Sequence, residues 1–191
     1  MTKFKKVLCI ICLAASFLLL AACGDSASSI LPAKTVKFQA GTVEIEGTTD
    51  LTITLESGET ALLDQLPELQ KADFSGSSCV DEIYQWAQAH PDVKVKYTVT
   101  LPDGQVLSNS EQNLDLSALT DSAVAETVQA LAYLPKVSNI QLGSERSDLG
   151  WDSVRAIMDA CPNASVSYTF WLYDKEFSTV DTTINLSHIP V

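Results

Sequence analysis

Basic residues and histidine are scarce in this sequence. Its 191 residues include 12 Lys and Arg, 24 Asp and Glu and two His, which gives a formal net charge of −12 at pH 7. Three of the 12 basic residues precede position 23 and no acidic residue does, so the rest of the chain carries a net charge of −15. Nucleic-acid binding needs a basic surface that displaces counterions from phosphates. The composition therefore excludes nucleic acid as a partner.

Long apolar runs and the common catalytic motifs are also missing. The apolar run at residues 7–20 would span about 21 Å as a helix, whereas the hydrocarbon core of a membrane is about 30 Å thick. The sequence has no Gly-x-Ser-x-Gly, Ser-x-x-Lys or His-Glu-x-x-His motif and no glycine-rich phosphate loop. A nucleophile pair of Cys79 and His90 would be separated by about 16 Å of helix. We expect no catalytic residue, no metal site and no cofactor.

The apolar run belongs instead to an amino-terminal signal. Three lysines precede it, as in secretory signal peptides. It ends in Leu20-Ala21-Ala22-Cys23, which resembles the lipobox of bacterial lipoprotein precursors. The resemblance implies a signal peptide at residues 1–22 and an acylated Cys23, whose fatty acyl chains, such as palmitate, anchor the protein at the extracytoplasmic face of the bacterial cell membrane. The alternative is an ordinary cleaved signal peptide with a cysteine there by chance.

A tether and two further cysteines follow this signal. Residues 23–34 are small, polar and aperiodic, which predicts a flexible tether. Only Cys79 and Cys161 remain in the expected folded part. A disulfide is feasible outside the cytoplasm. Because one cysteine is expected near a helix start and the other at a helix end, we favour buried free thiols.

The rest of the chain, residues 35–191, matches itself at an offset of about 70 residues. Three pairs recur in the same order, with offsets of 68, 71 and 71: Leu66-Pro67 and Leu134-Pro135, Pro91 and Pro162, Tyr97 and Tyr168. Offsets that drift by only three residues indicate an internal duplication with small loop insertions. We expect one domain, with copies at about 62–117 and 130–187 and a partial copy at 35–55.

Each copy combines a helix with a β-hairpin. Ser78 begins a Ser-x-x-Asp pattern typical of a capped helix start, and prolines at 91 and 162 end the two helical periods. Alternation of apolar and polar residues then predicts hairpins near 93–108 and 166–177. A third hairpin is expected at 36–45.

Short strands separate these parts, and we expect them at residues 51–55, 71–75, 113–117, 139–143 and 183–187. Apolar residues lead into two of the strands at a spacing of three, three, three and two: Leu63, Leu66, Leu69, Ala72 and Phe74, and Leu131, Leu134, Val137, Ile140 and Leu142. This spacing resembles the L-x-x-L-x-L core of leucine-rich repeats. The resemblance implies an α/β fold, an irregular leucine-rich-repeat-like stack of strand-helix units with inserted β-hairpins.

The sequence departs from that family in one respect. Ser77, Leu119 and Glu145 stand where the family has asparagine. The asparagine ladder under the sheet is therefore missing, and a regular horseshoe does not follow. The alternative is a mixed α+β domain made by duplication, without a solenoid.

A polar row and one tryptophan are candidates for contact with a partner. Asp73, Asp115, Gln141 and Asn185 occupy matching positions on expected strands and would line one exposed face if those strands were adjacent. Trp171 interrupts the polar side of its strand, which indicates an exposed contact residue or a cover for a neighbouring helix.

These features together predict a binding protein. A repeat stack exposes an extended surface, which suits a non-catalytic, lipid-anchored module that binds another envelope or surface protein or a glycan. A small solute-binding lipoprotein and a cell-envelope hydrolase are the alternatives.

Overall fold

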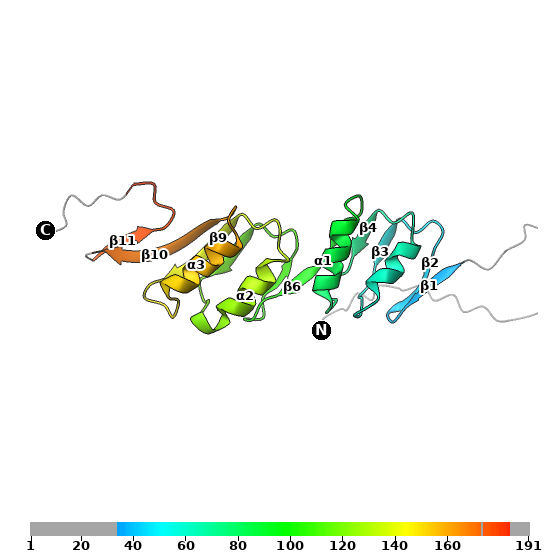
Figure 1. Cartoon of the computed structure of the whole chain (residues 1–191), viewed down its shortest axis with the longest axis horizontal. Helices are drawn as coiled ribbons and strands as arrows, with labels where there is room; N and C mark the ends of the chain where they lie inside the picture. Colours follow the sequence, from blue (N-terminus) through cyan, green and yellow to red (C-terminus); the bar gives the residue numbers. More distant parts are fainter. Residues whose placement is uncertain (1–33, 173, 184–191) are drawn as a thin grey trace, which may run out of the picture. The chain divides into compact units, whose positions relative to one another are not determined.

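The computed structural model describes residues 34–172 and 174–183, which belong to one compact unit, Ala33–Val191. The described residues form a mixed α/β fold with strands in several small sheets (Figure 1). The predicted signal peptide, Cys23 and nearly all of the expected tether lie outside the described residues. The expected last strand at residues 183–187, with Asn185, lies outside them too, apart from Thr183.

The fold begins with a β-hairpin. Strand β1 (Thr35–Phe38) pairs antiparallel with β2 (Gly41–Glu44), which confirms the predicted amino-terminal hairpin. Val36 and Phe38 are buried whereas Thr35 and Lys37 are exposed, because successive side chains of a strand point to opposite faces.

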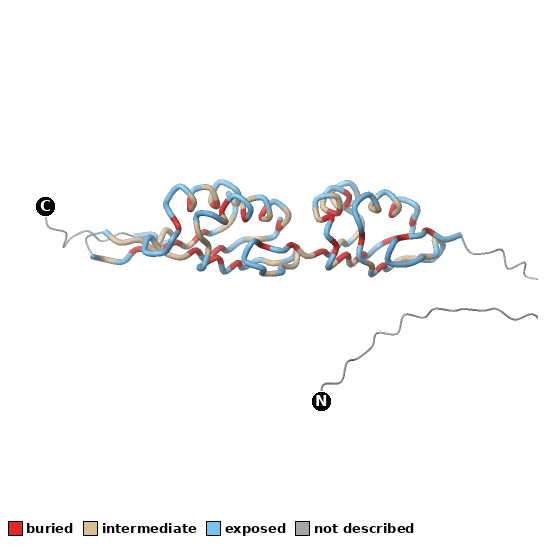
Figure 2. The backbone as a smooth tube through the Cα atoms, turned by 90° about the horizontal axis from the view of Figure 1, so that it is seen from below, coloured by how far each residue is buried: buried red, intermediate tan, exposed pale blue. Residues whose placement is uncertain are grey.

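The first sheet has three parallel strands, β3 (Asp50–Thr52), β4 (Lys71–Asp73) and β5 (Lys94–Lys96), in that order. The 3-10 helix η1 (Thr60–Gln65) connects β3 to β4, and α1 (Val80–Ala89) connects β4 to β5. Parallel neighbours need such crossover connections. Figure 2 shows both helical segments on the same side of the strands, which leaves the other side of the sheet open.

The second sheet has the order β11-β10-β9-β8. Strands β8 (Asn113–Leu116), β9 (Asn139–Ser144) and β10 (Ser165–Leu172) are parallel, and β11 (Lys175–Ser178) returns antiparallel to β10. The β10–β11 pair confirms the predicted carboxy-terminal hairpin.

Helices again connect the parallel strands of this sheet. The 3-10 turn η2 (Asp121–Ala123) and α2 (Val124–Leu131) lie between β8 and β9, and α3 (Trp151–Ala160) lies between β9 and β10. The middle hairpin, β6 (Thr98–Thr100) with β7 (Val106–Ser108), follows β5 and precedes β8 in the chain. The parallel strands therefore form two sheets, and β5 and β8 are not paired.

The core lies between the sheets and their helices. The helices contribute Ile83, Val154 and Ile157, each with no exposed surface. Of the ten residues with the leucine-rich spacing, nine are buried and Val137 is half-buried. The predicted core positions are thus confirmed, because this spacing places every apolar residue toward the helix-covered face.

The two longer helices end as predicted, but the start of α1 differs. His90 and Cys161 are the C-cap residues, with φ, ψ of −121°, 65° and −127°, 65°, because a residue before proline is excluded from the helical region. At the other end of α1 the N-cap is Cys79, and no side chain caps the helix. The prediction that Ser78 caps it is therefore wrong, since Ser78 lies one residue too early.

The β6–β7 and β10–β11 hairpins are closed at their base in the same way. The N–H of Tyr97 donates to Asn109 Oδ1 at 3.3 Å, and the N–H of Asn109 donates back to the Tyr97 carbonyl at 3.0 Å. The N–H of Tyr168 donates to Thr179 Oγ1 at 2.9 Å, and the N–H of Thr179 donates back to the Tyr168 carbonyl at 3.0 Å. The backbone N–H groups of the two tyrosines are therefore bonded by different polar side chains, an asparagine and a threonine.

Candidate functional site

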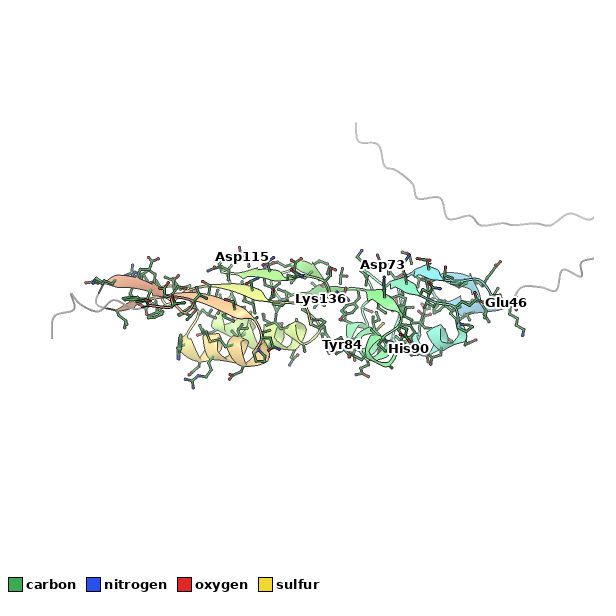
Figure 3. The ribbon with its side chains drawn as sticks, turned by 90° about the horizontal axis from the view of Figure 1, so that it is seen from above. Glu46, Asp73, Tyr84, His90, Asp115 and Lys136 are labelled. Atoms are coloured by element: carbon green, nitrogen blue, oxygen red, sulfur yellow. The ribbon has the colours of Figure 1, made fainter. Side chains whose placement is uncertain are left out.

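The predicted polar row is divided between the two sheets. Asp115 and Gln141 are register partners on β8 and β9. Asp73 lies on β4, whose neighbours are β3 and β5, and Asn185 lies outside the described residues. Figure 3 labels Asp73 and Asp115 on their separate sheets. The prediction of one row is thus wrong for Asp73, because the β6–β7 hairpin intervenes in the chain between the two sheets.

Asp73 is engaged by lysine on its own sheet. Its Oδ2 lies 2.8 Å from Lys96 Nζ on β5, and a second cross-strand pair joins Lys71 Nζ to Asp50 Oδ1 at 3.1 Å. Although burial opposes the shift, hydrogen bonds from Lys96 and Ser75 lower the pKa of Asp73 below its usual range. Lysine therefore balances the charge of both carboxylates, and no bound ligand is needed to explain why they lie on this face.

The open face of the second sheet is polar, and none of the ion pairs between described residues lies on it. Asn139 Nδ2 donates to Asn113 Oδ1 at 2.9 Å across β9 and β8. Asp115 is exposed, and hydrogen bonds from Ser117 lower its pKa. A solvated sheet surface explains this arrangement.

Trp171 is not the exposed contact residue that its position in β10 predicts. Its side chain is half-buried, and the guanidinium carbon of Arg146 lies 4.0 Å from the centre of its ring. This cation–π contact covers the indole. The tryptophan with most exposure is Trp151, at 51%.

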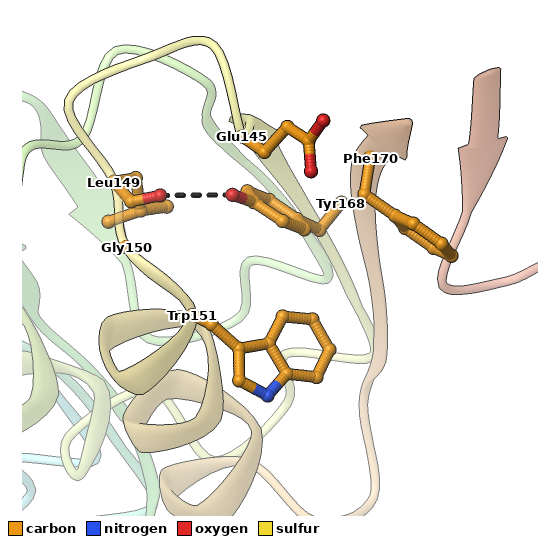
Figure 4. Close-up of a pocket in the computed structure, with 6 residues that line it drawn as sticks. All are labelled: Glu145, Leu149, Gly150, Trp151, Tyr168 and Phe170. Atoms are coloured by element: carbon orange, nitrogen blue, oxygen red, sulfur yellow. Dashed lines mark hydrogen bonds between the residues drawn. The ribbon is translucent and has the colours of Figure 1, made fainter. Parts of the chain in front are cut away.

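Trp151 lies in an aromatic hollow of about 480 Å³ (Figure 4). The hollow, which we call the Trp151 pocket, is formed by the β9–α3 loop, the first residue of α3 and strand β10: Glu145, Leu149, Gly150, Trp151, Tyr168 and Phe170. Tyr168 is buried and donates its hydroxyl to the Leu149 carbonyl at 3.0 Å. The rings of Trp151 and Tyr168 are 6.1 Å apart at 52°. Phe170 is half-buried on the same face of β10 as Tyr168 and stacks on Phe177.

Asp121 fixes the loop that places Trp151. Its Oδ1 accepts hydrogen bonds from the Gly150 N–H at 2.8 Å and from Ser153 Oγ at 2.6 Å. The same two bonds, that from Ser153 being the larger influence, lower the pKa of Asp121. A carboxylate that accepts bonds at the start of a helix also interacts favourably with the helix dipole. Asp121 of η2 therefore fixes the N-terminal end of α3.

The surroundings of the Trp151 pocket are acidic. An adjoining hollow of about 570 Å³ shares three lining residues with it and adds the carboxylates of Asp121 and Asp148. Neither hollow is lined by Lys, Arg or His. Burial, followed by the negative charges of Glu145 and Asp121, raises the pKa of Tyr168. The pocket thus combines aromatic faces with neighbouring carboxylates.

Helical spacing alone does not reveal this pocket. Trp151, Val154 and Met158 share a spacing of three and four, which is also typical of a buried helix face. Trp151 is half exposed because it is the first residue of α3, where the β9–α3 loop leaves its indole beside β10. Tyr168 and Phe170 belong to an alternating strand pattern that equally suits a closed core.

The remaining candidates for chemistry have structural roles. Cys79 and Cys161 are free thiols, as predicted, but only Cys79 is buried as expected, whereas Cys161 is half-buried. Burial raises the pKa of each thiol. A raised pKa disfavours the thiolate that nucleophilic attack requires. Cys79 and His90 cap opposite ends of α1.

His90 is instead part of a cluster that attaches η1 to α1. Its ring stacks on Trp86 with centroids 4.2 Å apart, and Trp86 Nε1 donates to Asp64 at 2.8 Å. Trp86 is buried, and the bond to Asp64 satisfies its indole N–H.

The described residues contain no metal-binding cluster and no membrane-spanning helix. Among the described residues, no group of three or more His, Cys, Asp or Glu side chains is arranged to hold a metal ion. No helix in this part of the chain has the length and apolar character needed to cross a membrane. Comparison with protein-family models, curated proteins and solved structures finds no match to the chain.

Proposed function

We propose that this protein is a non-catalytic binding module anchored through acylated Cys23 at the extracytoplasmic face of the bacterial cell membrane. Its partner is another envelope or surface protein or a glycan. The lysines, the short apolar run and the Leu-Ala-Ala-Cys sequence support the anchor. Two or three acyl chains on one residue hold a protein stably, whereas one chain binds marginally. The charge of −15 beyond position 22 would keep the folded part away from an anionic membrane surface.

The folded part, in this proposal, is a short leucine-rich-repeat-like stack made by duplication. Helices α1 and α3 support this interpretation, because each has ten residues and they begin 71 residues apart. The matched hydrogen bonds at Tyr97 and Tyr168 support it as well. Stacked repeats expose extended surfaces and need few special residues, which suits a binding role.

The Trp151 pocket is the observation that carries the binding function. Ligand sites are mostly apolar hollows with a few polar groups at their edge, and a half-exposed tryptophan beside a buried tyrosine fits that description. The volume of about 480 Å³ also suits a small molecule, so a solute-binding lipoprotein is the second candidate.

Two experiments test the proposal. A photo-crosslinking amino acid at position 122, an exposed serine that lines the adjoining hollow, should capture a surface partner in intact cells, and capture should fall when Trp151→Ala is added. The same amino acid at position 68, an exposed glutamate in the β3–β4 connection, is the control. Capture that is equal at both positions, or unchanged by Trp151→Ala, contradicts binding at the pocket. A thermal shift with one sugar or amino acid, abolished by Trp151→Ala, would favour the solute-binding candidate instead.

The anchor is tested separately. Cys23→Ala should abolish incorporation of radioactive palmitate and release the protein into the medium or leave an unprocessed precursor. Continued labelling of Cys23→Ala would contradict the anchor.

A further inference from the structure

The first half of the fold has a counterpart of the Trp151 pocket. Val80 is the first residue of α1 and Val99 lies on β6, and each is 71 residues before Trp151 on α3 and Phe170 on β10. Small aliphatic side chains therefore stand where the second half has aromatic ones. The larger aromatic side chains of the second half give it a contact surface that differs from that of the first half.

The counterpart is a hollow of about 510 Å³ that is lined in part by the segment after α2. Val80 and Val99 line a hollow together with Tyr133, which follows α2. The Tyr97 hydroxyl donates to the Tyr133 carbonyl at 2.8 Å, and the Tyr133 ring packs edge-on against Tyr84 at 5.6 Å. In the second half, within the described residues, Tyr168 bonds to the adjacent β9–α3 loop instead, and Trp151 keeps 51% of its surface exposed. The Trp151 pocket thus lies where the first half makes an internal contact.

The chemistry of the pocket selects one kind of occupant. A cation over the face of an aromatic ring is attracted by its quadrupole, most strongly for tryptophan. Figure 4 shows the Glu145 carboxylate pointing toward the space beside Tyr168 and Phe170. Within the described residues Glu145 enters no ion pair, and the neighbouring cation Arg146 is placed over Trp171.

We propose that the Trp151 pocket receives a lysine or arginine side chain from a basic segment of the partner protein, an inference that rests on the proposed function. The charged group of such a side chain lies over the Trp151 ring and in the field of the Glu145 carboxylate, and its aliphatic part packs against Phe170.

Charge complementarity favours this occupant over others. A neutral apolar side chain would bury the edge of the Glu145 carboxylate without a partner, which is unfavourable. An acidic segment would be repelled by Glu145 and Asp148 and by the net charge of −15 beyond position 22. A glycan can stack on the indole but gains little from the carboxylates.

The test uses the full chain in detergent micelles and three probes of stated chemistry. These are the capped peptide Gly-Gly-Lys-Gly-Gly, the same peptide with norleucine for lysine, and an oligosaccharide of N-acetylglucosamine. Isothermal titration calorimetry measures the binding of each probe to the parent and to every variant, and the NMR signal of the Trp151 indole N–H, assigned with Trp151→Phe, locates the bound probe in the parent. We expect saturable binding of the lysine peptide, weakened about fivefold to thirtyfold by Trp151→Leu, which keeps an apolar side chain but removes the aromatic face. Raised salt should weaken it further.

Matched variants separate a specific carboxylate from overall charge. Glu145→Gln should weaken binding of the lysine peptide severalfold, whereas Glu68→Gln, with the same change in charge, should not. Circular dichroism checks that each variant is folded. Equal binding of the norleucine peptide, or equal effects of the two glutamine variants, overturns the inference. Preference for the oligosaccharide, lost in Trp151→Leu, overturns the inference but leaves the proposed binding function intact. No binding of any probe, together with crosslinking that Trp151→Ala leaves unchanged, overturns both.

Discussion

Tyr97 and Asn109 close the base of the β6–β7 hairpin with two reciprocal hydrogen bonds, of 3.3 and 3.0 Å. The Asn109 amide also donates to the Val95 carbonyl at 3.0 Å, so one side chain satisfies two backbone groups of the incoming strand. Thr179 does the same for Tyr168 and Val166 with a single hydroxyl. The position after the returning strand therefore needs a side chain that both accepts and donates, and its identity matters less than this capacity.

Asn109→Ala should destabilise the fold. It leaves the Tyr97 N–H and the Val95 carbonyl without their partner, and a part-buried polar group left unsatisfied costs about 1–3 kcal/mol. Urea unfolding followed by circular dichroism measures the change in the free energy of unfolding. Asn109→Thr, which introduces the side chain found at position 179, should recover much of the loss. An Asn109→Ala variant as stable as the parent would show that these bonds are not required.

The stability of the fold should fall at alkaline pH because of Tyr97. Burial, followed by the charge of Tyr84, raises the pKa of Tyr97 to about 12. Above the ordinary tyrosine pKa of about 10 the unfolded chain releases this proton while the folded chain retains it, so unfolding becomes easier as pH rises from about 10 to 12. Urea midpoints across that range measure the decline. Tyr97→Phe should flatten it, although the variant starts from a lower stability because it loses the bond to the Tyr133 carbonyl. Parallel pH profiles of the two proteins would contradict the assignment to Tyr97.

Local periodicity predicted several individual elements of the fold. The hairpins at β1–β2, β6–β7 and β10–β11, the C-terminal ends of α1 and α3 and the buried leucine spacing are all properties of short segments. Each depends on alternation, on helical spacing or on a proline, which act over a few residues. They needed no knowledge of which strands pair.

Local periodicity does not predict which distant strands pair. Asp73 and Asp115 were placed in one row because their positions match, but pairing depends on where the chain leaves the first sheet after Lys96. The side chain that covers Trp171 is Arg146, from a loop whose path no spacing rule fixes. The Trp151 pocket was missed for the same reason, since its residues come from a helix start, a loop and a strand.

Asp73→Asn should change stability little. The pair with Lys96 is short, but the lysine side chain is 57% exposed and that of Asp73 is 31% exposed, so water screens the attraction. Such pairs contribute about 0–1 kcal/mol, and we expect a loss of less than about 0.5 kcal/mol in urea unfolding. Lys96→Gln should behave alike, since it removes the same contact. A loss above about 1.5 kcal/mol in either variant would mean that this face is buried against a further surface.

Asp121→Ala should disturb Trp151 without unfolding the protein. The change removes the acceptor for the Gly150 N–H and the Ser153 hydroxyl, so the start of α3 loses the contact that places the indole beside Tyr168. The near-ultraviolet circular dichroism of the aromatic residues should change, and the midpoint of thermal unfolding should fall by about 2–4 °C. Asp121→Asn keeps a carbonyl oxygen, and its unfolding midpoint should lie between those of the parent and Asp121→Ala.

Because the pKa of Asp121 is lowered in the folded state, its stabilisation is complete above the ordinary carboxyl pKa and is lost as pH falls through the lowered value. The parent should therefore lose its advantage over Asp121→Ala in acid, and an advantage that persists once Asp121 is protonated would show that the charge of Asp121 is not what holds the loop.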